Sequence, residues 1–318
     1  MNKKLKVVSM FAGCGGLDFA FHKQSNNFDV IYVNDINQDS CNTYEKYYKH
    51  KPKCGDIAKI TTIPDCDILT GGFPCQGFSL ANSSRNESDS RNKLYLELVR
   101  LLKHKRPKYF IFENVKGIQQ LGGYENKEDK KNKNGKIFKI ILSDLKECGY
   151  TIHTKLFKMK WYDIPQNRER VIFIGIRNDI AATIIFNWAE EKQEITKTLH
   201  DAIGDLPIDY DENIQHIGTK QKVKINGYMG NRKLEWNKIS PTITCATIQV
   251  HPSGKRRMTV REYARIQTFP DDFIFSGSMS SMYRQIGNAV PPKFSFILAN
   301  LILKLNSQLY CLKENLEV

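Results

Sequence analysis

The sequence lacks any pair of cysteines spaced as Cys-x-x-Cys, although it contains eight cysteines. This absence argues against a zinc site or a disulfide scaffold, and we expect no bound metal. An apolar run long enough to span a membrane is also missing. The short apolar run that follows Lys6 and ends at Cys14 resembles a lipoprotein signal only weakly, because the glycines after it fit a loop better.

Acidic residues are fewer than basic ones. The chain has 34 Asp and Glu residues against 48 Lys and Arg residues, which gives a formal net charge of +14. This excess favours a polyanionic partner such as nucleic acid, although the same charge also serves solubility. With 318 residues, 41% of them hydrophobic, the chain is long enough for a large core and two domains.

Strand and helix patterns alternate in the first half of the chain, which predicts a doubly wound parallel sheet. We expect strands at residues 6–11, 30–33, 68–70, 109–112, 151–159 and 171–176. We expect helices at residues 17–23, 40–48, 94–102, 137–145, 261–267 and 295–305. The alternation weakens after about residue 178, which indicates a second, irregular domain.

Two polar stretches interrupt this pattern. Residues 79–93 are rich in Ser, Asn and Asp, and they are expected to form a mobile loop beside the active site. Residues 122–136 combine glycines with a run of Lys, Glu, Asp and Asn. That run is expected to be a solvated loop, and no function is assigned to it.

The first expected strand leads into the glycine-rich segment Phe11–Gly16, which indicates a ligand loop at the start of a helix. Asp35 ends the next strand, where a carboxylate binds ribose hydroxyls in nucleotide sites. Asp56 follows the strand after that, at a position suited to an adenine. A nicotinamide loop needs a third glycine at position 18, but this residue is Asp18.

The end of the strand at 68–70 carries Cys75, in the segment Gly-Gly-Phe-Pro-Cys-Gln-Gly-Phe-Ser at 71–79. A thiol at the open end of a strand is placed for attack rather than for packing. Glu113 ends another apolar strand, and Arg168 and Arg170 precede a further one. Each of these residues alone is more often a packing or surface residue, but their order beside a ligand loop favours an active site.

These motifs together resemble the bacterial DNA (cytosine-5)-methyltransferase family over nearly the whole chain. The resemblance rests on Pro74-Cys75-Gln76, Glu113-Asn114-Val115, Gln166-x-Arg168-x-Arg170, residues 261–270, and Gln285-x-Gly287-Asn288-Ala289-Val290-Pro291. It implies a Rossmann-like α/β domain that binds S-adenosylmethionine, with a smaller irregular domain for target recognition. It implies transfer of a methyl group to carbon 5 of a cytosine that has been flipped out of double-stranded DNA.

The resemblance also assigns roles to single residues. Cys75 is the expected nucleophile that adds to carbon 6 of the base. Glu113 is expected to contact the ring nitrogen and the exocyclic amine, and Arg168 to hold the ring carbonyl or a phosphate with support from Arg170. The expected cofactor neighbours are Phe11, Gly13, Cys14, Gly15, Gly16, Leu17, Asp35, Ile36, Asp56, Ile57, Pro74, Leu94, Asn288 and Ala289.

Target recognition is assigned to the second domain. We expect a catalytic domain at 1–178 and 284–318, a recognition domain at 179–265 and a hinge at 266–283. Residues 261–270 resemble the segment that organises the recognition domain, and the C-terminal helix is expected to complete the cofactor domain. The expected DNA contacts are Gln76, Ser79, Arg232, Lys233, Thr242, Gln249, His251, Lys255, Arg256 and Arg257.

The chain departs from the family pattern in a few places. The family often has Glu where this chain has Asp35, and some relatives have a serine where it has Ala81. The resemblance favours a protein of the bacterial cytoplasm that belongs to a restriction-modification system, and the existence of a paired endonuclease is left open. A monomer is the default expectation. Alternatives are a tRNA methyltransferase, although its Cys-Phe-Thr signature is missing, an amino-group methyltransferase, a nicotinamide oxidoreductase, and a non-catalytic DNA-binding protein.

Overall fold

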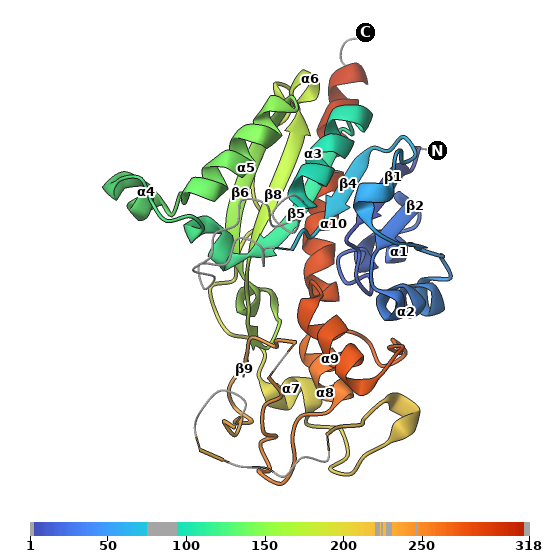
Figure 1. Cartoon of the computed structure of the whole chain (residues 1–318), viewed down its shortest axis with the longest axis vertical. Coiled ribbons are helices and arrows are strands. Elements are labelled where there is room, and N and C mark those ends of the chain that lie inside the picture. Colours follow the sequence, from blue (N-terminus) through green and yellow to red (C-terminus); the bar gives the residue numbers. More distant parts are fainter. Residues whose placement is uncertain are drawn as a thin grey trace.

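The computed structural model describes residues 3–74, 94–219, 223, 225–226, 231–245 and 247–314. Cys75, Gln76, Ser79, Ala81 and the loop expected at 79–93 lie outside the described residues. A seven-stranded sheet forms the upper part of the molecule in Figure 1. Its strands, in spatial order, are β3 (Lys53–Cys54), β2 (Phe28–Asp35), β1 (Leu5–Met10), β4 (Ile68–Gly71), β5 (Tyr109–Val115), β8 (Glu169–Arg177) and β6 (Tyr150–Lys158).

We predicted a parallel sheet, but the observed sheet is mixed. β3, β2, β1, β4 and β5 pair in parallel, but β8 is antiparallel to both β5 and β6. The cause is the connection between β6 and β8, which holds a 3₁₀ turn at Met159–Tyr162 and the short strand β7 (Gln166–Asn167) instead of a crossover helix. The predicted Rossmann-like α/β class is confirmed.

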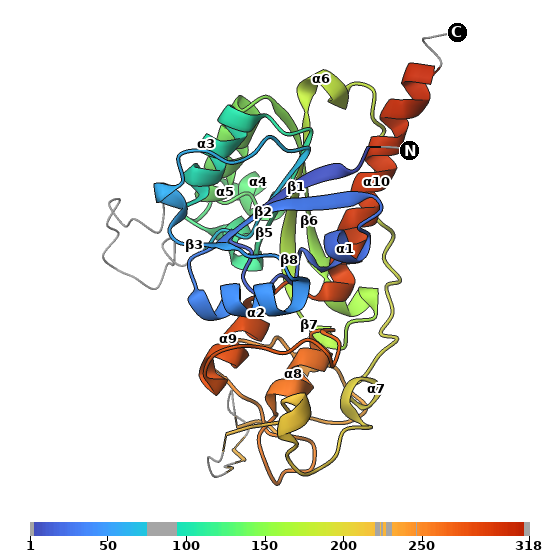
Figure 2. The same ribbon diagram turned by 90° about the vertical axis from the view of Figure 1, so that its right-hand side faces the viewer.

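Helices cover both faces of the sheet, as Figure 2 shows. Those of the sheet domain are α1 (Phe19–Lys23), α2 (Gln38–Tyr48), α3 (Leu94–Lys105), α5 (Lys136–Glu147), α6 (Asn178–Ala181) and α10 (Pro292–Glu314). Side-chain alternation in the strands explains the two layers. Val7 and Ile111 belong to the core under α1 and α10, whereas Val8 and Phe110 belong to the core under α3 and α5.

The stretch Met279–Leu309 is long and apolar enough to cross a membrane by length and composition alone, although none was expected from the sequence. Within its most apolar window, 67% of the stretch is buried inside the protein. It consists of α9 (Met279–Asn288) and most of α10, with Pro291 between the two helices and Pro292 as the first residue of α10. This burial is typical of a core helix in a globular domain.

The second region lies below the sheet domain in Figure 1 and contains little regular structure. It holds α7 (Leu199–Ile203), α8 (Val260–Ile266), the strand β9 (Ser240–Pro241), and a 3₁₀ turn at Glu212–Ile214. β9 pairs in parallel with β7. A third core gathers Leu199, Val260 and Phe273 with Cys14 and Phe19 from the start of the chain, so the two regions share buried apolar surface.

The polar run at 122–136, expected to be a loop, contains the short helix α4 (Lys127–Asn132). Asn126 caps it by accepting a hydrogen bond from the backbone N–H of Asp129. None of its residues is buried, and Figure 1 shows α4 projecting from the sheet domain.

Candidate active site

A cavity of about 920 Å³ lies at the edge where β1, β2, β4 and β5 end. Its volume is in the range of small-molecule sites, and its position is the usual ligand position in an open α/β sheet. Residues that we predicted for the cofactor and for catalysis converge there. Those lining the cavity are Phe11, Gly13, Cys14, Gly16, Leu17, Asp35, Ile36, Pro74, Glu113, Arg170, Asn288 and Ala289.

The glycine loop takes backbone conformations that most residues avoid. Gly13 has a φ of +56° and Gly15 a φ of +90°, which are in the region that glycine enters at little cost. The Tyr48 hydroxyl donates to the Gly15 carbonyl at 2.7 Å. A Cβ on Gly16 would lie 2.2 Å from the Val290 carbonyl oxygen. The loop is therefore held between α2 and the segment that precedes α10.

Asp35, at the end of β2, lines the cavity next to the glycine loop. Its Oδ2 accepts from the Gly13 N–H and its Oδ1 from the Asn37 N–H, both at 2.8 Å. Burial raises the pKa of Asp35, and these backbone donors act against that rise. Each carboxylate oxygen keeps a free lone pair, so Asp35 has room to accept further hydroxyl groups.

Cys14 lines the cavity, but it is a packing thiol. Its side chain is buried, and its Sγ lies 3.8 Å from the Gln285 carbonyl oxygen. Burial raises the pKa of Cys14 to about 12. The thiol is therefore protonated and unreactive at neutral pH.

Glu113 and Arg170 face the cavity as a pair. Arg170 is the register partner of Val115 across β5 and β8, so Glu113 lies diagonal to it on one face of the sheet. The Arg170 Nε lies 2.6 Å from the Glu113 Oε1. The pair presents a carboxyl group and a guanidinium side by side to whatever enters.

Asn114 organises the segment before Cys75. Its Nδ2 donates to the Phe73 carbonyl at 3.0 Å, and its Oδ1 accepts from the Val115 N–H at 2.8 Å. This side chain links the end of β5 to the chain two residues before Cys75. Cys75 itself follows Pro74, a cavity residue, in the sequence.

Arg168 does not line the cavity with Arg170. It is fully buried, and its guanidinium donates to the carbonyls of Gly287 at 3.0 Å and Ala289 at 2.9 Å. Desolvation lowers the pKa of Arg168. The structure places this side chain behind residues 287–289, where it supports the wall that Asn288 and Ala289 form.

Four predicted cofactor neighbours are absent from the described lining of the cavity: Gly15, Asp56, Ile57 and Leu94. Asp56 caps the 3₁₀ turn at Ile57–Lys59 by accepting from the Ala58 N–H. Ile57 is buried in the core beneath α3, and Leu94 packs against the same core. Gly15 instead contacts Tyr48, as described above.

Several residues that line the cavity were not predicted from the sequence. Arg284 and Ser281 come from α9, a helix that we did not predict, and Cys245 comes from an irregular segment. The Cys245 Sγ lies 2.7 Å from the Asn288 Oδ1. Gln285 also lines the cavity, and it stands in one of the motifs quoted for the resemblance. No sequence signal distinguished Arg284 from other basic residues.

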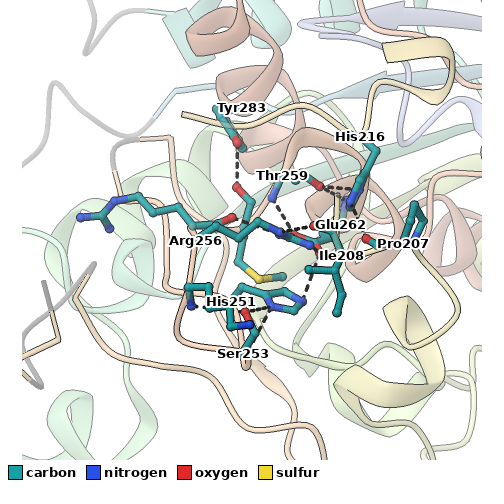
Figure 3. Close-up of polar contacts among 12 residues, drawn as sticks. Pro207, Ile208, His216, His251, Ser253, Arg256, Thr259, Glu262 and Tyr283 are labelled. Atoms are coloured by element: carbon teal, nitrogen blue, oxygen red, sulfur yellow. Dashed lines mark hydrogen bonds and ion pairs between the residues drawn. The ribbon is translucent and has the colours of Figure 1, made fainter. Parts of the chain in front are cut away.

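In the second region, His251 and Arg256 turn inward around Glu262, as Figure 3 shows. Arg256 binds both Glu262 oxygens, at 2.9 and 2.7 Å, and the carboxylate is only 1% exposed. The Ser253 N–H donates to the His251 Nδ1 at 3.1 Å, so His251 Nε2 carries the proton and faces Glu262 at 3.3 Å. Burial lowers the pKa of His251 to about 4, and the ring is neutral at pH 7.

The same cluster begins α8. Glu262 Oε2 accepts from the Thr259 N–H at 2.7 Å, and Thr259 Oγ1 accepts from the Glu262 N–H at 3.1 Å, which is a capping box. His216 bonds the Thr259 hydroxyl at 3.0 Å. These contacts join several loops of the second region, and we leave His251 and Arg256 out of the proposed DNA surface because their polar atoms have internal partners.

The other DNA candidates differ in exposure. Arg257 donates to the Ile248 carbonyl and to Asn231 Oδ1. Thr242 donates to the Asn167 carbonyl, and the backbone N–H of Gln249 bonds the Tyr263 hydroxyl. The exposed candidates in the described part of this region are Arg232, Lys233 and Lys255.

Comparisons with known proteins identify the family of the chain. The family model described as "C-5 cytosine-specific DNA methylase" matches residues 5–247 and 209–304. The type II methyltransferase M.Eco47II of Escherichia coli is 33% identical, over 96% of this chain and 80% of its own length. The type II methyltransferase M.NgoFVII of Neisseria gonorrhoeae is also 33% identical, over 97% of this chain and 89% of its own length.

Solved structures share the fold at lower identity. A putative DNA modification methyltransferase encoded within a prophage of E. coli has a TM-score of 0.74 at 22% identity, and covers 96% of this chain and 100% of its own. The Dnmt2 methyltransferase of S. pombe has a TM-score of 0.70 at 20% identity, and covers 95% of this chain and 100% of its own.

Proposed function

Because the chain belongs to the C-5 cytosine-specific DNA methylase family, we propose that its cavity joins a methyl-donor site to a pocket for one cytosine. The protein is a DNA (cytosine-5)-methyltransferase of the type II restriction-modification kind, and S-adenosylmethionine is its methyl donor. The observation that carries the finer proposal is that Asp35 and Glu113 line one continuous cavity.

The described residues fit the methyl donor. The cavity of about 920 Å³ is large enough for a molecule of this size. The free lone pairs of Asp35 suit two ribose hydroxyls, and the absence of a side chain at Gly13 leaves the loop backbone open to the ligand. When bound there, S-adenosylmethionine supplies an electrophilic methyl group on sulfur.

We propose that Cys75 is the nucleophile. Addition of its thiolate to carbon 6 of the cytosine forms a carbon–sulfur bond and makes carbon 5 electron-rich enough to accept a methyl group. The methyl group moves to carbon 5 and leaves the donor as a neutral thioether. Water or another base then takes the proton from carbon 5, the carbon–sulfur bond breaks, and the thiolate returns. The position of Cys75 directly after Pro74, a cavity residue, supports this role.

Glu113 and Arg170 act on the other side of the ring in this proposal. The Glu113 carboxyl group contacts the ring nitrogen and the exocyclic amine of the cytosine, and Arg170 holds the carboxyl group and the ring carbonyl in place. The distance of 2.6 Å between Arg170 Nε and Glu113 Oε1 supports this arrangement. We assign Arg168 the role of a positioning residue for 287–289.

The remaining proposals concern organisation. We propose that residues 1–178 with 284–318 form the catalytic domain, that 179–265 read the target sequence, and that 266–283 act as the hinge. The protein is proposed to work as a monomer in the bacterial cytoplasm beside a restriction endonuclease. The cavity is built from one chain, and the relatives above are named type II methyltransferases.

The deciding experiment follows labelled methyl transfer from S-adenosylmethionine to unmethylated genomic DNA, with base-resolved mapping of 5-methylcytosine. We expect one enriched sequence context with the wild type and none with Cys75→Ala, which should still bind S-adenosylmethionine. Turnover by Cys75→Ala would contradict the proposed nucleophile. A parallel assay with tRNA tests the alternative substrate, and a signal on tRNA alone would contradict the assignment to DNA.

A further inference from the structure

The helix α4 and its flanks carry an excess of lysine that neither the core nor the cavity uses. The helix buries none of its residues. A polar helix that packs on nothing adds no burial to the fold, so its side chains are available to a partner. The exposed lysines of this arm, defined as residues 125–136, are Lys127, Lys130, Lys131, Lys133 and Lys136.

Two of the three acidic residues of the arm are paired with a lysine from outside it. Lys139 of α5 lies 2.5 Å from Glu125 Oε2 and 3.1 Å from Asp129 Oδ2. These two hydrogen bonds raise the pKa of Lys139. Of the three acidic residues in the arm, only Glu128 is left without such a contact in the described structure. The five exposed lysines therefore outnumber the acidic residues that remain unpaired, and the outer surface of the arm is net positive.

The base of the arm is anchored to a wall of the cavity. The Gly135 N–H donates to the Gln119 carbonyl at 2.8 Å, and the Lys136 N–H donates to the Gly123 carbonyl at 2.9 Å. The first of these bonds joins the arm to the 3₁₀ turn Lys116–Gln120, and Gly117 and Gln120 of this turn line the cavity. The arm is thus attached next to a turn that lines the cavity. Figure 1 shows α4 projecting outward from the sheet domain.

We propose that Lys127, Lys130, Lys131 and Lys133 bind phosphates of the DNA duplex beside the target cytosine, without reading its sequence. A six-residue helix is about 9 Å long, which matches about three base-pair steps of 3.4 Å. Two to three phosphate contacts therefore fit along the arm. This inference rests on DNA as the substrate and adds a contact surface outside the recognition domain.

The test compares two variants with the same net charge. One variant replaces Lys127, Lys130, Lys131 and Lys133 with Gln. The matched control replaces four other exposed lysines, Lys3, Lys4, Lys103 and Lys146, with Gln. Lys3 and Lys4 precede β1, and Lys103 and Lys146 lie near the C-terminal ends of α3 and α5, so the control removes charge from the opposite edge of the sheet.

Affinity for a 30-base-pair duplex of random sequence is measured across a series of salt concentrations. We expect the arm variant to lose about tenfold or more in affinity, and its log–log salt slope to fall by about 2 because each phosphate contact contributes about 0.9. The control should stay within about twofold of wild type, and replacing the four arm lysines with Arg should preserve the slope.

Equal losses in the arm variant and the control would reduce the effect to net charge and overturn the proposal. Wild-type affinity in the arm variant would also overturn it, and loss of binding to polyglutamate in that case would assign the arm to an acidic protein instead. Failure of the wild type itself to bind DNA would count against the function and not against the arm, which separates the two results.

Discussion

Charged side chains have opposite surroundings in the cavity at the sheet edge and in the region below the sheet. In the cavity, Asp35, Glu113 and Arg170 line open space. In the second region, Glu262, Arg256 and His251 close on one another and are largely hidden from solvent. A charge that faces a cavity is available to a ligand, whereas a charge enclosed by its partners fixes the shape of the surrounding loops.

The largest expected effect tests the cavity side of this comparison. Glu113→Gln keeps the shape of the side chain but removes its acid, so methyl transfer at saturating substrates should fall about 10²- to 10⁴-fold. Binding of S-adenosylmethionine, measured by calorimetry, should change by less than about twofold. Glu169→Gln is the control, because Glu169 pairs with Lys116 and is absent from the described cavity lining. Equal activity of Glu113→Gln and wild type would remove Glu113 from the mechanism.

The next effect tests the enclosed cluster. Glu262→Ala leaves Arg256 and His251 without their shared partner, and the free energy of unfolding should fall by about 3–5 kcal/mol. Asp271→Ala is the matched control, since Asp271 is 45% exposed and pairs with Arg265, and it should cost less than about 1 kcal/mol. Urea unfolding measures both. An equal loss of stability in the two variants would contradict the role of the Glu262 cluster in holding the loops of the second region together.

A pH comparison separates one buried group in each region. Burial raises the pKa of Asp18 from 3.8 to about 6, so its contribution to stability is full below pH 3.8 and is lost as pH rises through 6. Burial lowers the pKa of His251 from 6.5 to about 4, so its contribution is full above pH 6.5 and is lost as pH falls through 4. Each is worth at most about 3 kcal/mol.

Urea unfolding at pH 4, 5, 6 and 7 measures this difference. The free energy of unfolding of Asp18→Asn, relative to wild type, should be lowest at acidic pH, because wild-type Asp18 is then protonated and contributes most. The free energy of unfolding of His251→Gln, relative to wild type, should be lowest at neutral pH, because wild-type His251 contributes most there. The two difference curves should therefore have opposite slopes between pH 4 and pH 7. Slopes of the same sign would contradict the assigned environments.

The smallest effect on stability concerns the exposed side of the second region. Replacing Arg232 and Lys233 with Ala should change the free energy of unfolding by less than about 0.5 kcal/mol, because both side chains are exposed. The same change should lower the salt slope of DNA binding by up to about 2. Replacing Lys103 and Lys304 is the control. A large loss of stability with an unchanged salt slope would contradict the proposal, because Arg232 and Lys233 would then support the fold and not bind DNA.

The sequence predicted the sheet and the cavity well because both follow from periodic patterns. Apolar strands end at Met10, Asp35, Gly71 and Val115, and the ends of parallel strands meet at one edge. The reversed direction of β8 was not predictable from strand patterns, since it depends on how the chain returns from β6. The inward turn of Arg256 was equally hidden, because it depends on Glu262 in a capping box that only the folded loops bring within reach.

Arg168, Gln267 and Gln166 form one hydrogen-bonded unit behind the cavity wall. Arg168 and Gln267 both donate to the Ala289 carbonyl, Gln166 donates to Gln267, and the Ile243 N–H donates to the Gln166 Oε1. Ala289 lines the cavity that we propose for the methyl donor, and Ile243 follows Thr242 in the second region. If the methyl donor and DNA both contact this unit, one from each end, their binding free energies are coupled. Coupling of this kind is reciprocal. If bound DNA changes the dissociation constant of the methyl donor by some factor, the bound methyl donor must change the dissociation constant of DNA by the same factor.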